Sequence, residues 1–100
     1  MIRHIVFFKL KSVANQQQSE DLLNQVRLKL EELPARIPQI LSFETGINAI
    51  PGKDAADLSL TAVFADAEDL RTYQEHPEHK AFVEWNREIC PKFSVIDYHI

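Results

Sequence analysis

The hydrophobic residues of this chain switch repeatedly between the two-residue period of a strand and the three-to-four-residue period of a helix. This switching limits the possible folds more than any other feature of the sequence. Strand-like stretches cover residues 2–10, 40–48, 57–65 and 93–100, and helix-like stretches cover residues 12–33, 66–75 and 77–90. The expected order is βαββαβ, with the second helical region in two segments. We therefore expect an α+β protein of the ferredoxin-like class, with helices on one face of a four-stranded antiparallel sheet.

Proline and capping residues set the limits of the expected helices. The first helix carries an apolar stripe that includes Leu22 and Val26. It ends before Pro34, because proline disfavours helical geometry in the residue that precedes it. Asp66 is suited to cap the second helix, and Pro77 fits the first turn of the third.

The first strand has apolar residues on both faces, although the helices cover only one face of the sheet. The uncovered face would carry Ile5 and Phe7 from the first strand and Val63 from the third. An exposed apolar patch usually marks an interface. We therefore expect a homodimer that packs through the open sheet face and forms a dimeric α/β barrel.

Length and composition indicate one globular domain over residues 1–100, since 45% of the residues are hydrophobic and 26% are charged. The net charge of −4 disfavours nucleic acid as a partner. No apolar run approaches the roughly 20 residues that span a membrane, and residues 1–10 do not resemble a signal peptide. The single cysteine, Cys90, cannot form an internal disulfide, so we expect a cytoplasmic protein.

Residues 73–82 contain the strongest candidates for chemistry, namely Tyr73, His76 and His79. Histidine can act as a general acid or base near neutral pH, and tyrosine can donate a hydrogen bond to a developing oxyanion. The alternative is structural: His76 caps a helix and His79 is a solvated residue of the first helical turn. Spacing alone favours this alternative, because His-x-x-His pairs arise often by chance.

Metal and cofactor sites are not expected. His76, Glu78 and His79 could contribute metal ligands, but Pro77 breaks the helical geometry between the histidines and no further ligand lies at a suitable spacing. The chain has two glycines, too few for a glycine-rich phosphate loop. Cys90, at the end of a helix, is expected to fill the core rather than to act as a nucleophile.

Two further polar residues stand in apolar strands. His4 lies on the Ile2, Val6 and Phe8 face of the first strand, where a lone histidine is usually a hydrogen-bonded core residue. Asp97 lies in the last strand, and burying an aspartate without a partner is costly. If Asp97 is buried, we expect a hydrogen-bonded partner, for which a histidine is suited.

Several motifs together resemble the stress-responsive dimeric α/β-barrel (Dabb) family. They are the first strand with Ile-Arg-His-Ile-Val (residues 2–6), Leu-Ser-Phe-Glu-x-Gly (41–46), His-Pro-x-His with Ala-Phe (76–82) and Val-Ile-Asp-Tyr (95–98). The resemblance covers essentially the whole chain, and it implies the ferredoxin-like subunit and the sheet-to-sheet dimer expected above.

The resemblance also implies a candidate site, because the family includes plant polyketide cyclases of the olivetolic acid cyclase type. Their aldol chemistry uses no cofactor, and their catalytic pattern corresponds here to His79 paired with Asp97, together with Tyr73 and His4. Leu58 stands where such an enzyme has a further histidine. The expected pocket between helices and sheet would have a ligand-binding wall of Val6, Phe8, Leu22, Val26, Leu58, Leu60, Phe82 and Trp85.

Two functions follow as hypotheses. The first is a stress-responsive barrel protein that binds a small apolar or carbonyl-containing ligand. The second is a cofactor-independent lyase or cyclase that abstracts a proton α to a carbonyl with a His-Asp pair. A haem- or quinol-handling monooxygenase of the same barrel type is a third interpretation, but no cofactor signature accompanies it. The loop over residues 49–57 either gates the pocket or simply joins two strands.

Overall fold

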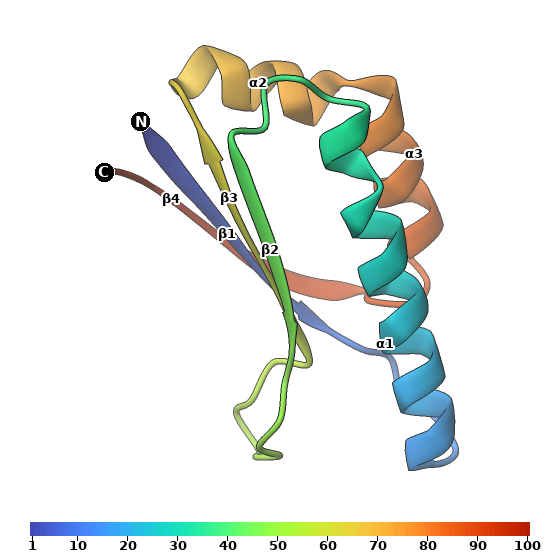
Figure 1. The fold of residues 1–100 in the computed structure, drawn as a ribbon. Coiled ribbons are helices and arrows are strands. Elements are labelled where there is room, and N and C mark those ends of the chain that lie inside the picture. Colours follow the sequence, from blue (N-terminus) through green and yellow to red (C-terminus); the bar gives the residue numbers. More distant parts are fainter.

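The computed structural model describes residues 1–100 and has the expected element order. The elements are β1 (Ile2–Lys9), α1 (Gln16–Glu31), the short 3-10 helix η1 (Leu33–Ala35), β2 (Ser42–Ile47), β3 (Leu58–Phe64), α2 (Ala67–Glu75), α3 (Pro77–Asn86) and β4 (Lys92–His99). The four strands form one sheet in the order β2-β3-β1-β4 (Figure 1). Every neighbouring pair is antiparallel, so the predicted ferredoxin-like fold is confirmed.

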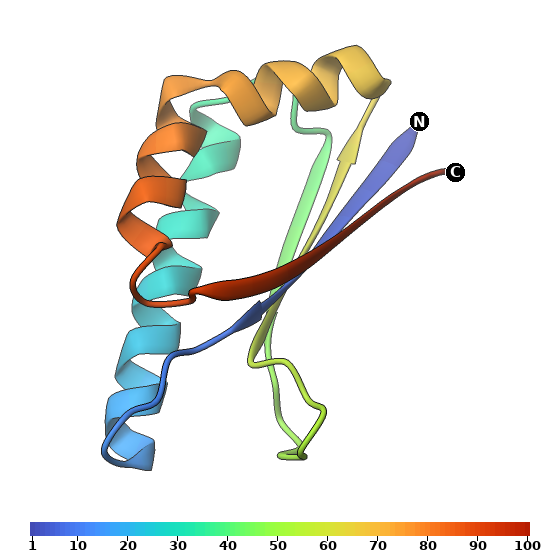
Figure 2. The ribbon, with the colours of Figure 1, turned by 180° about the vertical axis from the view of Figure 1, so that it is seen from behind.

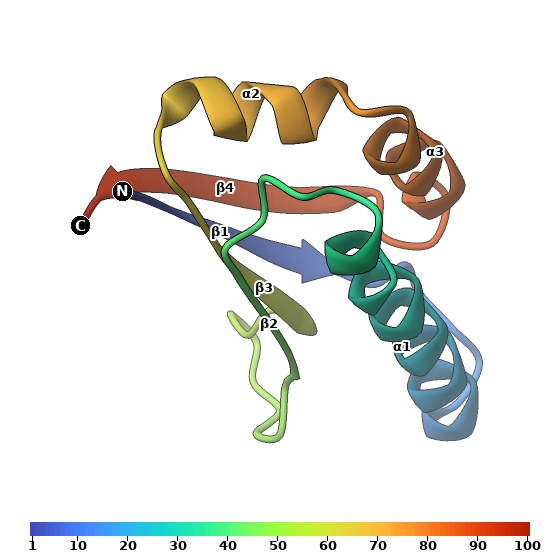
Figure 3. The same cartoon turned by 45° about the horizontal axis from the view of Figure 1, so that its top comes forward.

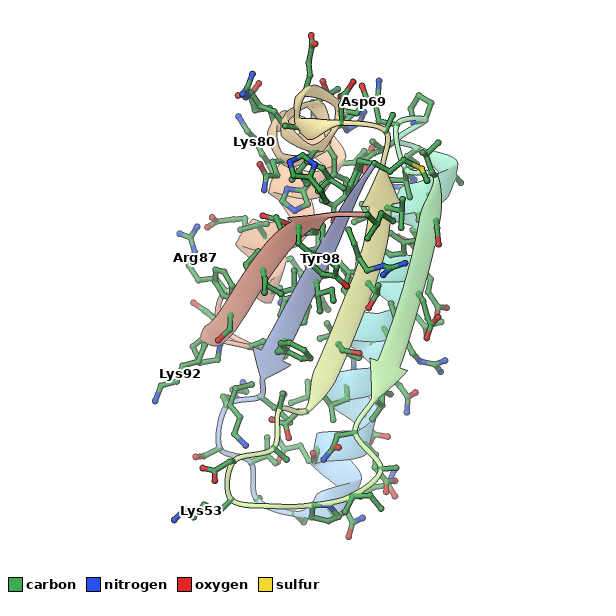
Figure 4. All side chains as sticks on the ribbon, turned by 90° about the vertical axis from the view of Figure 1, so that its left-hand side faces the viewer. Lys53, Asp69, Lys80, Arg87, Lys92 and Tyr98 are labelled. Carbon is green, nitrogen blue, oxygen red and sulfur yellow. The ribbon has the colours of Figure 1, made fainter.

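The helices lie on one side of the sheet, and the other side is open (Figures 3 and 4). Alternate residues of the two central strands point toward the helices and are buried, among them Val6 and Phe8 of β1 and Leu60 of β3. Val26 and Leu30 of α1 complete this part of the core, and α1 packs against β2. None of the helices is both long and apolar enough to cross a membrane.

Two helix limits differ by about four residues from the sequence-based prediction. The first helix begins at Gln16 rather than near residue 12, because Asn15 caps it by accepting a hydrogen bond from the backbone N–H of Gln18 at 2.9 Å. The third helix ends at Asn86 rather than at Cys90. Its last carbonyl, that of Asn86, accepts hydrogen bonds from Ile89 and Cys90 as the chain turns toward β4.

The edge strand β4 is exposed along its whole length. Figure 2 shows it running along the edge of the sheet, beside β1, from the end of α3 to the C-terminus, which lies beside the N-terminus. Phe93 and Val95 are on the helix side of β4, opposite Phe8 and Val6, but they are 61% and 46% exposed. The helices therefore leave a gap above β4, and the candidate site lies there.

Candidate functional site

A cavity of about 300 Å³ lies between α2, α3 and the β1–β4 half of the sheet. Ten of its sixteen lining residues are hydrophobic. The lining consists of His4, Val6, Phe8, Leu30, Leu60, Tyr73, Gln74, His79, Phe82, Val83, Asn86, Arg87, Cys90, Pro91, Phe93 and Val95. An apolar wall with a few polar side chains is the usual composition of a small-molecule site.

His4 and Asp97 form a hydrogen-bonded pair beside this cavity. They stand directly opposite each other in the antiparallel register of β1 and β4, so their side chains share one face. The His4 Nδ1 atom and the Asp97 Oδ1 atom are 2.5 Å apart. The imidazole is 5% exposed and the carboxylate 36% exposed. A carboxylate at Nδ1 leaves the lone pair of the neutral ring at Nε2.

The predicted pairing of His79 with Asp97 is wrong. In the strand register, Asp97 stands opposite His4. His79 lies near the start of α3, and its Nδ1 atom has a different partner. That atom lies 3.1 Å from the backbone carbonyl oxygen of Gln74, which can only accept a hydrogen bond. Nδ1 of His79 therefore carries the hydrogen, and Nε2 of the neutral ring is a free acceptor.

The environment of His79 favours the neutral imidazole. Burial lowers the pKa of His79 below its ordinary value of 6.5, and the hydrogen bond to Gln74 acts in the opposite direction. Positive charge on His4 or His76 also lowers the pKa of His79. At neutral pH, His79 is thus a neutral base at the cavity wall.

The ring of Tyr73 lies near both imidazoles. Its ring centroid is 4.4 Å from that of His79 and 6.0 Å from that of His4. The side chain is almost completely buried, and this burial raises the pKa of the Tyr73 hydroxyl well above its ordinary value of 10. The hydroxyl therefore keeps its proton at neutral pH and can donate a hydrogen bond to a carbonyl oxygen.

His76 has a structural contact instead. Its Nδ1 atom accepts a hydrogen bond from the backbone N–H of Glu78 at 3.1 Å and so caps α3. The Glu78 carboxylate in turn forms an ion pair with Arg36 at 2.9 Å. No group of three or more His, Cys, Asp or Glu side chains is arranged to hold a metal ion.

Four of the eight residues predicted to form the ligand-binding wall line the cavity, and four do not. Val6, Phe8, Leu60 and Phe82 are in the lining. The prediction is wrong for Leu22, Val26, Leu58 and Trp85, which lie outside it. The reason is the position of α1, which covers the β2 side of the sheet, so that Leu22 and Val26 face that half rather than β4. Trp85 points away toward α1, where the ammonium of Lys29 lies 5.4 Å from its ring.

Asn86 is a cavity residue that the sequence-based reasoning missed. It is 5% exposed, and its Oδ1 atom is buried without a hydrogen-bond partner. A buried polar group left in this state costs about 1–3 kcal/mol of folding stability. The signal in the sequence was its position four residues after Phe82, where the apolar stripe of α3 leads one to expect a hydrophobic residue.

The β2–β3 loop does not border this cavity. Ala49 and residues 53–56 instead line a second, open hollow of about 840 Å³ at the end of the sheet where β2 and β3 are joined. Phe7, Lys9 and Leu58 also contribute to it. The loop is tied to the end of β1 by a hydrogen bond from Lys9 Nζ to the carbonyl of Ala55, and to the residue after β1 by one from Leu10 N to the Asp57 carboxylate. It joins two strands, and none of its residues lines the histidine cavity.

The family model described as "Stress responsive A/B Barrel Domain", or Dabb, matches residues 2–100. The chain belongs to the Dabb family. An uncharacterized protein of Streptomyces coelicolor is 30% identical over 98 residues, with 98% of each chain covered. The expected membership in this family is thus confirmed over almost the whole chain.

Solved structures agree with this fold assignment. A dimeric protein of unknown function with a ferredoxin-like fold from Bacteroides fragilis superimposes with a TM-score of 0.87 at 30% identity, covering 99% of this chain and 95% of its own. A hydroxynitrile lyase from Passiflora edulis gives a TM-score of 0.81 at 22% identity, covering 99% of this chain and 92% of its own. At that identity, the likeness to the lyase concerns the fold alone.

Proposed function

We propose that this Dabb protein binds a small, mostly apolar carbonyl compound in the cavity between α2, α3 and the sheet. The observation that carries the proposal is the cavity itself, in which hydrophobic side chains surround a few polar groups. Its volume is at the lower end of the range of about 300–1,000 Å³ that is typical of ligand pockets. This volume favours a ligand of about one ring.

The polar groups of the wall indicate the carbonyl group. Tyr73 is a hydroxyl donor that keeps its proton, and a carbonyl oxygen is the matching acceptor. A carboxylate is a poorer ligand for the inner wall, because neither lysine nor arginine stands among the buried lining residues and Arg87 is held at the exposed rim beside Glu84.

Acetophenone, a ketone of one aromatic ring, tests the binding proposal. We expect saturable shifts of the backbone amide signals of Val6, Phe82 and Asn86 in an NMR titration. Val83→Trp, at the partly exposed rim of the cavity, should weaken binding at least tenfold by blocking entry. The control Leu28→Trp changes an exposed residue of α1 that does not line the cavity, and it should bind like the wild type. Shifts that do not saturate, or that Val83→Trp leaves unchanged, contradict the proposal.

A second candidate function is proton abstraction α to the bound carbonyl, as in a cofactor-independent lyase or cyclase. It is favoured by a specific observation, namely that Nδ1 of both His79 and His4 is occupied, which leaves both Nε2 atoms free. Nε2 of His79 would take the α-proton, and the electron pair of the C–H bond would move onto the carbonyl oxygen. The Tyr73 hydroxyl would stabilise the resulting enolate. The Passiflora lyase indicates that this fold can host lyase chemistry, and the similarity to polyketide cyclases stays a prediction.

Deuterium exchange tests this chemistry without a known substrate. In D₂O, we expect the protein to accelerate the exchange of the methyl protons of acetophenone, and we expect His79→Gln to remove about 100-fold or more of that acceleration. His76→Gln is the matched control, because His76 caps α3 and does not line the cavity. Exchange no faster than in buffer would leave binding as the function of the cavity.

We also propose that the protein is a homodimer that associates through the open face of its sheet. Phe7 of β1 and Ile96 of β4 lie on that face and are 46% and 53% exposed. The Bacteroides structure with 30% identity is described as dimeric, which supports the same state here. The test of this proposal is argued in the Discussion.

A further inference from the structure

Asn86 differs from the other polar lining residues of the cavity in having a fully buried side-chain oxygen without a hydrogen-bond partner. Nδ1 of His4 bonds Asp97, and Nδ1 of His79 bonds the Gln74 carbonyl. The Oδ1 atom of Asn86 is buried and bonds nothing. A polar atom in such a place usually has a partner, so its absence within the protomer needs an explanation.

The position of Asn86 at the end of α3 does not provide that explanation. Asparagine often ends a helix because it tolerates a left-handed backbone, but no residue of this chain has a positive φ. The backbone carbonyl of Asn86 accepts the bonds that close the last turn, from Ile89 and Cys90 at 3.1 and 2.9 Å. An apolar side chain would serve this backbone role equally well.

One other buried side-chain atom, in Arg27, also has no hydrogen-bond partner, but its surroundings differ from those of Asn86. Nε of Arg27 is also buried without a partner, but the same guanidinium bonds Asn24 through Nη2 and lies near Glu31 through Nη1. Arg27 therefore has its contacts elsewhere and lines neither of the two hollows. Asn86 has none, and it is in the wall of the cavity that contains His4, Tyr73 and His79.

We infer that Asn86 binds a hydroxyl group of the ligand, so that the protein takes hydroxylated carbonyl compounds in preference to unsubstituted ones. This inference rests on the proposed function and deepens it. The Oδ1 atom is an acceptor and requires a donor. A charged ammonium donor does not suit the site, because no aspartate or glutamate lines the cavity and its walls are mostly apolar. A hydroxyl is neutral, and it can also accept a hydrogen bond from the Nδ2 atom of the same amide.

The arrangement divides recognition between two parts of the ligand. The carbonyl group is placed at Tyr73 and the two imidazoles, and the hydroxyl is placed at Asn86 on α3. Phe8 and Phe82, whose rings are 6.4 Å apart, belong to the apolar part of the same cavity wall. A site that is built to bond a hydroxyl discriminates against analogues that lack it, because the buried polar group then stays unpaired.

The test compares acetophenone with 3′- and 4′-hydroxyacetophenone by NMR titration, using the ratio of dissociation constants within each protein variant. We expect the wild type to bind the better hydroxylated ketone about 3- to 10-fold more tightly, the value of one net neutral hydrogen bond. In Asn86→Leu, which is nearly isosteric and apolar, this ratio should fall to about 1. Asn86→Ala is a second variant that leaves the cavity open and should give the same ratio.

The matched control is Phe82→Leu, which alters the same wall one helical turn earlier and keeps the amide. It should retain the preference for the hydroxylated ketone, even if it weakens the binding of both ketones. Equal binding of the ketones by the wild type, or an unchanged ratio in both Asn86 variants, overturns the hydroxyl inference and leaves the proposed function standing. If neither ketone binds the wild type, the proposed function falls together with the inference.

Discussion

Two imidazoles line one cavity, and each is held through its Nδ1 atom by a different kind of acceptor. His4 bonds the carboxylate of Asp97, which fixes the tautomer and the orientation of the ring. His79 bonds a neutral carbonyl, and burial disfavours its protonated form. The two residues are therefore suited to different roles, with His79 as the base and His4 as a ring that the carboxylate holds in one orientation.

The lowered pKa of His79 predicts a pH dependence of stability. The unfolded chain has the ordinary value of 6.5, so below that pH it binds more protons at His79 than the folded chain does. The free energy of unfolding should therefore fall as the pH falls from about 7.5 through 6.5 toward the folded-state pKa. Replacing His79 removes this contribution.

Urea unfolding of the wild type and of His79→Gln between pH 5 and 7.5 measures the effect. The difference in unfolding free energy, wild type minus variant, should rise with pH over this window, because only the wild type has the titrating imidazole. A difference that is independent of pH, or that falls as the pH rises, contradicts the burial of His79.

The residues of the site could be predicted from the sequence better than their contacts could. Asp97 was expected to have a histidine partner, and it has one, but the choice between His4 and His79 depends on the register of β1 and β4. The apolar alternation determines which face a strand residue takes, but β1 and β4 are not joined by a turn that would set which residues stand opposite each other. Asn86 was missed for a related reason, since the burial of one helix position depends on where β4 lies.

At the scale of the elements, local side-chain chemistry fixes the start of α1. Asn15 accepts a hydrogen bond from the Gln18 backbone, and Gln18 Oε1 accepts one from the backbone N–H of Ala14 at 3.0 Å. These reciprocal bonds are close to a capping box, which satisfies N–H groups that the helix itself leaves free.

Asn15→Ala should therefore destabilise the protein by about 1 kcal/mol, the typical value of an N-cap. Thermal or urea unfolding would measure the loss. Ser12→Ala, three residues earlier at an exposed position outside any element, is the matched control and should have almost no effect. Equal stability of the two variants would show that the cap does not hold the first turn of α1.

The strands and their order followed from the sequence, because the alternation of apolar residues and the proline positions are strong local signals. Every strand was expected within about two residues of its observed limits. The end of α3 was placed four residues too late, since Ile89 and Cys90 continue the apolar spacing of the helix. In the structure the chain turns there, and the carbonyl of Ile89 accepts a hydrogen bond from Lys11 that ties the turn to the segment after β1.

The whole molecule is asymmetric, because three helices cover one face of the sheet and leave both the opposite face and the β4 edge exposed (Figure 4). The cavity lies between the helices and the sheet at the β4 edge, and Phe93 and Val95 of that strand line it. Alternate residues of the same strand, including Ile96 and Tyr98, belong to the open face. The strand β4 thus connects the candidate site to the proposed dimer interface.

Because β4 belongs both to the cavity wall and to the proposed interface, the oligomeric state is the property of the whole molecule to measure. Ile96 stands opposite Ile5 in the register of β1 and β4, and both lie on the open face. In the variant Ile96→Asp, a charge at this position would have to be buried in the dimer, but it stays solvated in a single protomer. We expect sedimentation experiments at micromolar concentration to give a dimer for the wild type and a monomer for Ile96→Asp. Leu28→Asp, which places the same charge on the exposed side of α1, should stay dimeric, and a monomeric wild type would refute the proposed interface.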